Sequence, residues 1–73
     1  MMSTVVNRDP EILGGVPVFA GTRVPVRILF EYLEAGDRLD EFLLDFPSVT
    51  RDQAIQLLDL AKVRVIESDE APA

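Results

Sequence analysis

Cysteine and histidine are both absent from this sequence. A chain without cysteine forms no disulfide and no thiolate metal site, and a chain without histidine lacks the commonest metal ligand and the usual general base. Acids do gather between residues 37 and 45, but their helical spacing suits a solvated face. We therefore expect no metal, no cofactor and no enzymatic activity.

Long apolar runs are missing as well. No stretch approaches the roughly 20 apolar residues that cross a bilayer, and the first residues lack the pattern of a signal peptide. We expect a cytoplasmic protein without membrane contact. Its 73 residues suffice for one domain, and a domain of this size is marginally stable alone. Because disulfides and metals are excluded, we expect a homodimer or a hetero-oligomer.

Basic residues are few. Thirteen acids face seven bases, which gives a net charge of −6, whereas a free-standing nucleic-acid binder is usually basic on at least one face. Three of the acids, Glu67, Asp69 and Glu70, lie close to the end of the sequence. We expect a single domain over residues 1–66 and a flexible acidic tail over residues 67–73.

Turn signals separate short β-prone runs in the first third of the chain. Residues 1–8 predict a short strand, Asp9-Pro10 predicts a helical turn, and Gly14-Gly15 ends that turn. Residues 17–19 and 22–24 predict the two strands of a hairpin, with residues 20–21 as its loop because Gly21 can adopt a positive φ. Pro25 ends the second run and can open a helix.

Apolar spacing then predicts a first helix over residues 25–35, ended by Gly36. One face repeats at i, i+3, i+4 and i+7 and consists of Val26, Leu29, Phe30 and Leu33. A second apolar row on another side consists of Ile28, Tyr32 and Ala35. Two interpretations of this row stay open. It packs against the N-terminal strands, or it forms a dimer or partner surface.

Two further helices are predicted. The same spacing indicates one over residues 38–46, which Pro47 ends. Thr50 and Gln53 form a capping box that starts another helix over residues 51–65. Its inner face is expected to hold Ala54, Ile55, Leu58, Ala61 and Val65. Apolar residues extend beyond that face, and a helix that is apolar all round is usually buried or paired. The candidates for a partner interface on it are Leu57, Leu60 and Val63.

These elements predict a mainly α fold, a three-helix helix-turn-helix domain with a short β-hairpin or strand element at its N-terminus. The second helix of that motif uses its N-terminal residues in the DNA major groove. The candidate DNA contacts are Arg51, Gln53 and Gln56, since arginine can read guanine and glutamine can read adenine. The alternative is that they are solvated helix-start residues, with Gln53 occupied by the capping box.

A dense run of residues resembles the family known as domain of unknown function 433. The matching segments are Asp9-Pro10-Glu11-Ile12-Leu13-Gly14-Gly15, Pro17-Val18 and Gly21-Thr22-Arg23-Val24-Pro25-Val26. The similarity continues to Ala61, and it departs at residues 38–39, where the family often has Ser-Pro. We expect a structural role for the signature residues Gly14, Gly15, Gly21, Thr22, Arg23 and Pro25. The Arg23 guanidinium is expected to hold the hairpin on the first helix.

The resemblance implies a function that composition does not. Such proteins are similar to homeodomain-like helix-turn-helix modules and to VapB-like antitoxins. The family implies a PIN-like ribonuclease toxin as the partner, operator DNA as a second ligand, and repression of the protein's own promoter. The apolar candidates named above would then contact the toxin. The acidic tail could imitate RNA phosphates, or it merely solubilises the chain. The alternative function is an interaction or dimerisation module that does not bind DNA.

Overall fold

Two short strands open the fold in the computed structural model, which describes residues 5–67. Strand β1 (Val6–Asn7) pairs antiparallel with β2 (Val18–Phe19), with Val6 opposite Phe19 and Asn7 opposite Val18. Between them the chain turns at Asp9, whose carboxylate accepts the Glu11 N–H at 2.9 Å. The short 3-10 helix η1 (Leu13–Gly15) comes next and leads back to β2.

The segment after β2 differs from the hairpin that the sequence predicts. The turn at residues 20–21 is present, with Gly21 at φ 79°, and the Phe19 N–H donates to the Val24 carbonyl at 3.0 Å. Residues 22–24 nevertheless form no strand, and β2 meets the returning chain through one bridge, Val18 to Pro25. Proline has no N–H and Pro25 leads directly into a helix, so the ladder cannot continue. The partner strand of β2 is therefore β1.

Three helices make up the rest of the described chain. They are α1 (Val26–Glu34), α2 (Leu39–Asp45) and α3 (Arg51–Glu67). The predicted helices agree with these bounds to within two residues. Gly36, at φ 89°, lies just beyond the end of α1. The Glu41 carboxylate accepts the Arg38 N–H at 2.9 Å, so Glu41 serves the N-terminus of α2.

The core lies where β2, α1, α2 and the first half of α3 meet. Its buried apolar residues are Val5, Val18, Phe19, Leu29, Phe42, Val49, Ala54 and Leu57. Phe42 is its centre, because its ring contacts those of Phe19, Tyr32 and Phe46 at centroid distances of 5.2–5.9 Å. Aromatic pairs in this tilted or edge-to-face geometry stabilise beyond their buried area. The mainly α, three-helix fold with a small antiparallel element at its N-terminus is confirmed.

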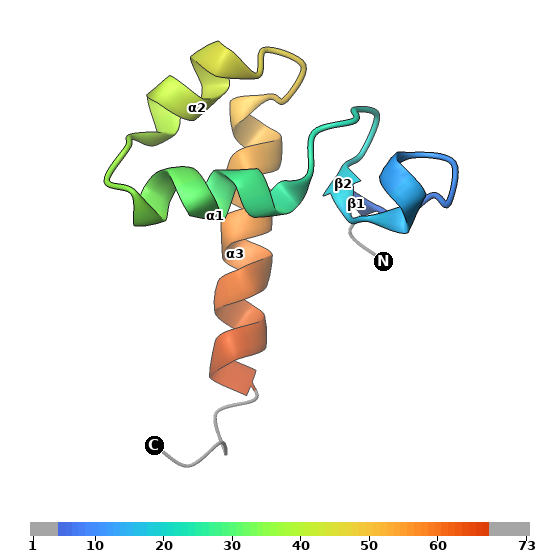
Figure 1. The fold of residues 1–73 in the computed structure, drawn as a ribbon. Helices are drawn as coiled ribbons and strands as arrows, with labels where there is room; N and C mark the ends of the chain where they lie inside the picture. Colours follow the sequence, from blue (N-terminus) through green and yellow to red (C-terminus); the bar gives the residue numbers. More distant parts are fainter. Residues whose placement is uncertain (1–4, 68–73) are drawn as a thin grey trace.

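The C-terminal half of α3 extends beyond the other elements, as Figure 1 shows. Ile55 is 47% exposed and Val65 is 69% exposed, so the prediction that both belong to the inner face is wrong. Leu57, predicted for a partner surface, lies in the core. A helix that is apolar on several sides does not indicate which side its neighbours cover. No helix in residues 5–67 has the length and apolar character needed to cross a membrane.

Candidate partner-binding groove

An apolar groove of about 410 Å³ lies between β1, the start of α1 and the second half of α3. Its lining residues are Val6, Arg8, Pro17, Val26, Phe30, Leu57, Leu60, Ala61 and Arg64. We call this the α1/α3 groove. Seven of the nine lining residues are apolar, which is typical of a site that takes an apolar side chain or helix face.

The two charged residues of the groove are both arginines. Arg8 comes directly after β1 and Arg64 lies in the last turns of α3, and both side chains are exposed. No hydrogen bond or ion pair of the Arg8 side chain occurs within residues 5–67. A guanidinium binds a carboxylate in a planar, two-bonded geometry. The α1/α3 groove therefore combines apolar walls with a group that suits a carboxylate.

Of the predicted partner residues within residues 5–67, the structure brings two into this groove, Leu57 and Leu60. Leu60 is half-buried on its wall. Leu57 lines it too, but it is only 5% exposed and belongs mainly to the core. Val63 is exposed on another side of α3, and Ala35 is exposed at the end of α1.

Two members of the second apolar row of α1, Ile28 and Tyr32, are half-buried. Both side chains pack against the core. The Tyr32 ring contacts two phenylalanine rings edge-to-face, Phe42 in α2 and Phe46 at the C-cap of α2. Tyr32 therefore packs against α2, while Ile28 packs against a core cluster that includes Phe19 of the N-terminal region. The sequence could not show the contact of Tyr32 with α2, because it depends on the angle at which α1 and α2 meet.

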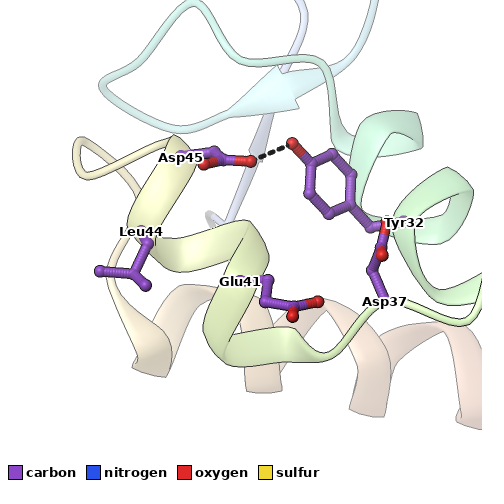
Figure 2. Close-up of a pocket in the computed structure, with 5 residues that line it drawn as sticks. All are labelled: Tyr32, Asp37, Glu41, Leu44 and Asp45. Carbon is purple, nitrogen blue, oxygen red and sulfur yellow. Dashed lines mark hydrogen bonds between the residues drawn. The ribbon is translucent and has the colours of Figure 1, made fainter.

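A second hollow, which is polar, lies between α1 and α2. Figure 2 shows its lining residues Tyr32, Asp37, Glu41, Leu44 and Asp45. The Tyr32 hydroxyl donates to the Asp45 carboxylate at 2.5 Å, and this bond raises the pKa of Tyr32, with smaller contributions from burial and neighbouring carboxylates. Leu44 points away from the tyrosine in Figure 2. Within residues 5–67 no cluster of three or more acidic residues is arranged to hold a metal ion.

The predicted DNA contacts at the start of α3 are largely engaged with the protein itself. Arg51 forms an ion pair with Asp40 of α2. Gln53 completes the predicted capping box, since the Gln53 N–H donates to Thr50 Oγ1 at 3.1 Å and Gln53 Oε1 accepts the Thr50 N–H at 3.0 Å. Gln53 Nε2 also donates to the Ala20 carbonyl at 2.9 Å. Gln56 is exposed.

Thr22, and not Arg23, secures the turn of the signature segment. The buried Thr22 hydroxyl donates to the Phe19 carbonyl at 2.8 Å and accepts the Val24 N–H at 3.0 Å. Arg23 is exposed, and its side chain has no hydrogen bond or ion pair within the described residues. The expected contact from Arg23 to the first helix is therefore not formed. A short hydroxyl can satisfy two nearby backbone groups at once, which a long arginine cannot do inside the turn.

The remaining predicted residues divide between turns and the chain end. Gly14, Gly15 and Gly21 all have positive φ, which fits the structural role expected of them. Pro25 occupies the N-cap position of α1. Glu67 is exposed at the end of α3, while Asp69 and Glu70 lie outside the described residues.

Residues 6–61 match the family described as protein of unknown function (DUF433). The chain belongs to this family. An uncharacterized protein of Sinorhizobium fredii is 39% identical over 49 residues, which cover 67% of this chain and 22% of that protein. A crystal structure of a DUF433 member from Anabaena variabilis resembles the fold with a TM-score of 0.66 at 23% identity. That match covers 94% of this chain and 64% of the Anabaena chain. The chain thus spans about a fifth of the first relative and less than two thirds of the second.

The part that matches DUF433 contains almost the whole α1/α3 groove. Every lining residue except Arg64 lies within residues 6–61. Pro17 and Val26, which belong to the signature run, form part of its wall. Arg8, Pro17 and Phe30 could not be recognised as groove residues from the sequence, because the segments that form the groove are far apart in the chain. Only the apolar excess of the last helix indicated that a surface was present.

Proposed function

We propose that this DUF433 protein is the antitoxin of a toxin–antitoxin pair, which binds and neutralises a PIN-like ribonuclease in the cytoplasm. The observation that carries the proposal is the α1/α3 groove, an apolar site on a small domain that has neither cysteine nor histidine for catalysis. The toxin's identity comes from the resemblance of the signature run to VapB-like antitoxins.

The chemistry of the groove suits one face of an amphipathic helix. Leu60 and Phe30 offer apolar contact, and the Arg8 guanidinium offers a partner for a carboxylate at the edge of that face. Helix-in-groove recognition uses this combination of apolar anchors and peripheral charge. The net charge of −6 complements the basic substrate cleft of a ribonuclease and would speed association with it.

Arg8→Glu tests the groove without disturbing the core. Arg8 is exposed and makes no bond within residues 5–67, so the variant is expected to fold normally. It should weaken binding to the proposed PIN-like toxin by about tenfold, as measured by calorimetry, and restore the toxin's ribonuclease activity in proportion. The matched control is Arg23→Glu, because Arg23 is also exposed but lies outside the groove. Equal loss in both variants, or in neither, contradicts a role for the groove.

Repression of the protein's own promoter is the second part of the proposal. Its support is the exposed position of Arg51 and Gln56 at the start of α3. Asp40 already neutralises Arg51, and Gln53 has both amide atoms in bonds to the protein, so few groups remain to neutralise phosphates. We expect DNA binding only in the toxin complex, which would supply further cations.

An anisotropy titration of promoter DNA at two salt concentrations, with and without toxin, checks this part. Binding that appears with toxin and weakens at higher salt supports it. Arg51→Ala combined with Gln56→Ala should then reduce the affinity, while toxin neutralisation is unchanged. If neither state binds DNA in a salt-dependent way, the protein is an interaction module that does not contact DNA.

A further inference from the structure

The outward side of α3 carries four exposed residues whose spacing is the same in both chain directions. Four exposed residues form one line along the helix at spacings of four, three and four: Ile55, Asp59, Lys62 and Ile66. At about 100° per residue they form one narrow stripe. We call it the α3 stripe. The groove residues of the same helix lie on its opposite side.

The stripe is apolar at both ends and charged at its centre. Ile55 is 47% exposed and Ile66 is 61% exposed, so neither is covered by the rest of the described chain. Between them the Asp59 carboxylate lies 3.4 Å from Lys62 Nζ, and both side chains are largely exposed. Spacings of four and three residues are those of a helix seam that packs against another helix.

We propose that the α3 stripe is a homodimer interface, in which α3 packs antiparallel against α3 of a second copy. The two-fold axis lies level with residues 60 and 61. In this register Ile55 meets Ile66 of the partner subunit, and Asp59 meets Lys62 of the partner subunit. The two-fold repeats each contact, so both ends are apolar and the centre contains two ion pairs.

Charge complementarity selects the antiparallel direction. A parallel pair in register would place Asp59 against Asp59 of the partner subunit and Lys62 against Lys62 of the partner subunit. Like charges in direct opposition destabilise a helix pair. The antiparallel register replaces both repulsive contacts with ion pairs. It still places isoleucine against isoleucine, as the parallel register would.

This dimer leaves the α1/α3 groove open. The stripe and the groove occupy opposite sides of α3, so a dimer would present two grooves that face outward. The dimer does not depend on the antitoxin function, and it can be tested with this chain alone. Failure of the dimer would leave groove binding unaffected, and failure of toxin binding would leave the dimer unaffected.

Cross-linking through introduced cysteines tests the register, and the natural chain contributes no background because it has no cysteine. Ile55→Cys and Ile66→Cys are made separately in the full chain. In the proposed dimer the two Ile55 positions are about 16 Å apart along the axis at about 1.5 Å per residue, too far for a disulfide. Mild oxidation of an equal mixture should therefore give cross-linked heterodimer, while each variant alone stays uncross-linked. Cross-linking of either variant with itself, or none in the mixture, overturns the proposal.

Charge exchange gives a second, independent measurement. Asp59→Lys alone should raise the dimer dissociation constant about fivefold, because the variant places cations opposite each other twice. Asp59→Lys combined with Lys62→Asp restores opposite charges and should recover the natural value. Sedimentation at several concentrations measures both, and circular dichroism verifies equal helicity. Recovery by the double variant is required, and its absence also overturns the proposal.

Discussion

The first half of α3 is tied to its neighbours by polar contacts, whereas the second half carries apolar surface that the described chain does not cover. At the start, Arg51 pairs with α2 and Gln53 binds the turn after β2. Towards the end, Val65 and Ile66 are more than half exposed. The comparison shows a helix that is anchored at one end, so that the other end is held in a defined direction with its apolar side chains exposed.

Leu57→Ala should have the largest effect on stability and mark the border between the two halves. Leu57 is buried among core residues, and removal of such a side chain costs about 2–4 kcal/mol through lost burial and the remaining cavity. Val65→Ala is the control in the exposed half and should change the free energy of unfolding by less than about 0.5 kcal/mol. Urea denaturation measures both. Similar losses would show that the second half is as tightly packed as the first.

Gln53→Ala should destabilise the protein by about 1–2 kcal/mol, because it removes the capping bond and the bond to Ala20 together. Gln53→Glu keeps an oxygen for the cap but loses the Nε2 donor. The loss of stability in Gln53→Glu relative to the natural chain therefore reports the link to the turn, and the difference between the two variants reports the capping bond; urea denaturation measures both. Gln56→Ala, on the same helix but exposed, is the control and should have almost no effect. A loss of stability in Gln56→Ala as large as that in Gln53→Ala would contradict a specific contribution of the Gln53 side-chain bonds.

Thr22→Val should cost about 1 kcal/mol or slightly more, since the hydroxyl serves two backbone groups and valine has nearly the same shape. This change affects the turn that presents the Ala20 carbonyl to Gln53. Arg23→Lys at the next position should leave the melting temperature unchanged. A larger loss for Arg23→Lys than for Thr22→Val would restore the structural role that the signature run predicts for the arginine.

Tyr32→Phe should have the smallest effect on stability at neutral pH, and its effect should become measurable at alkaline pH. The bond to Asp45 raises the pKa of Tyr32 in the folded protein. The stability that this shift contributes is fully present below the unfolded pKa of about 10 and is lost as the pH rises through the folded value. Melting temperatures between about pH 8 and 12 should therefore fall less steeply for Tyr32→Phe than for the natural chain. Parallel curves would exclude this contribution.

Features that depend on neighbouring residues could be predicted from the sequence. The capping box of Thr50 and Gln53, the turn at Gly21 and the bounds of all three helices rest on groups a few positions apart, and the structure contains each of them. The signature run also indicated the DUF433 family correctly.

Features that depend on how helices meet could not be predicted. Ile55 and Leu57 have similar apolar character, yet one is exposed and the other buried, because only the packing of α3 against its neighbours decides between them. Arg8, Pro17 and Phe30 come together in the groove for the same reason. Arg23 drew attention through its place in the signature, but the neighbouring Thr22 makes the side-chain bonds that hold the turn.

The bond between Gln53 and Ala20 also has a consequence for the order of folding. It joins positions 33 residues apart, and closure of a loop of that length costs about 3 kcal/mol of chain entropy. Both α1 and α2 lie inside this loop, and each can form from local contacts alone. The capping box can likewise start α3 on the microsecond scale of helix formation. We expect the docking of α3 on the turn to be the slow step, so that Gln53→Glu reduces the folding rate more than it accelerates unfolding.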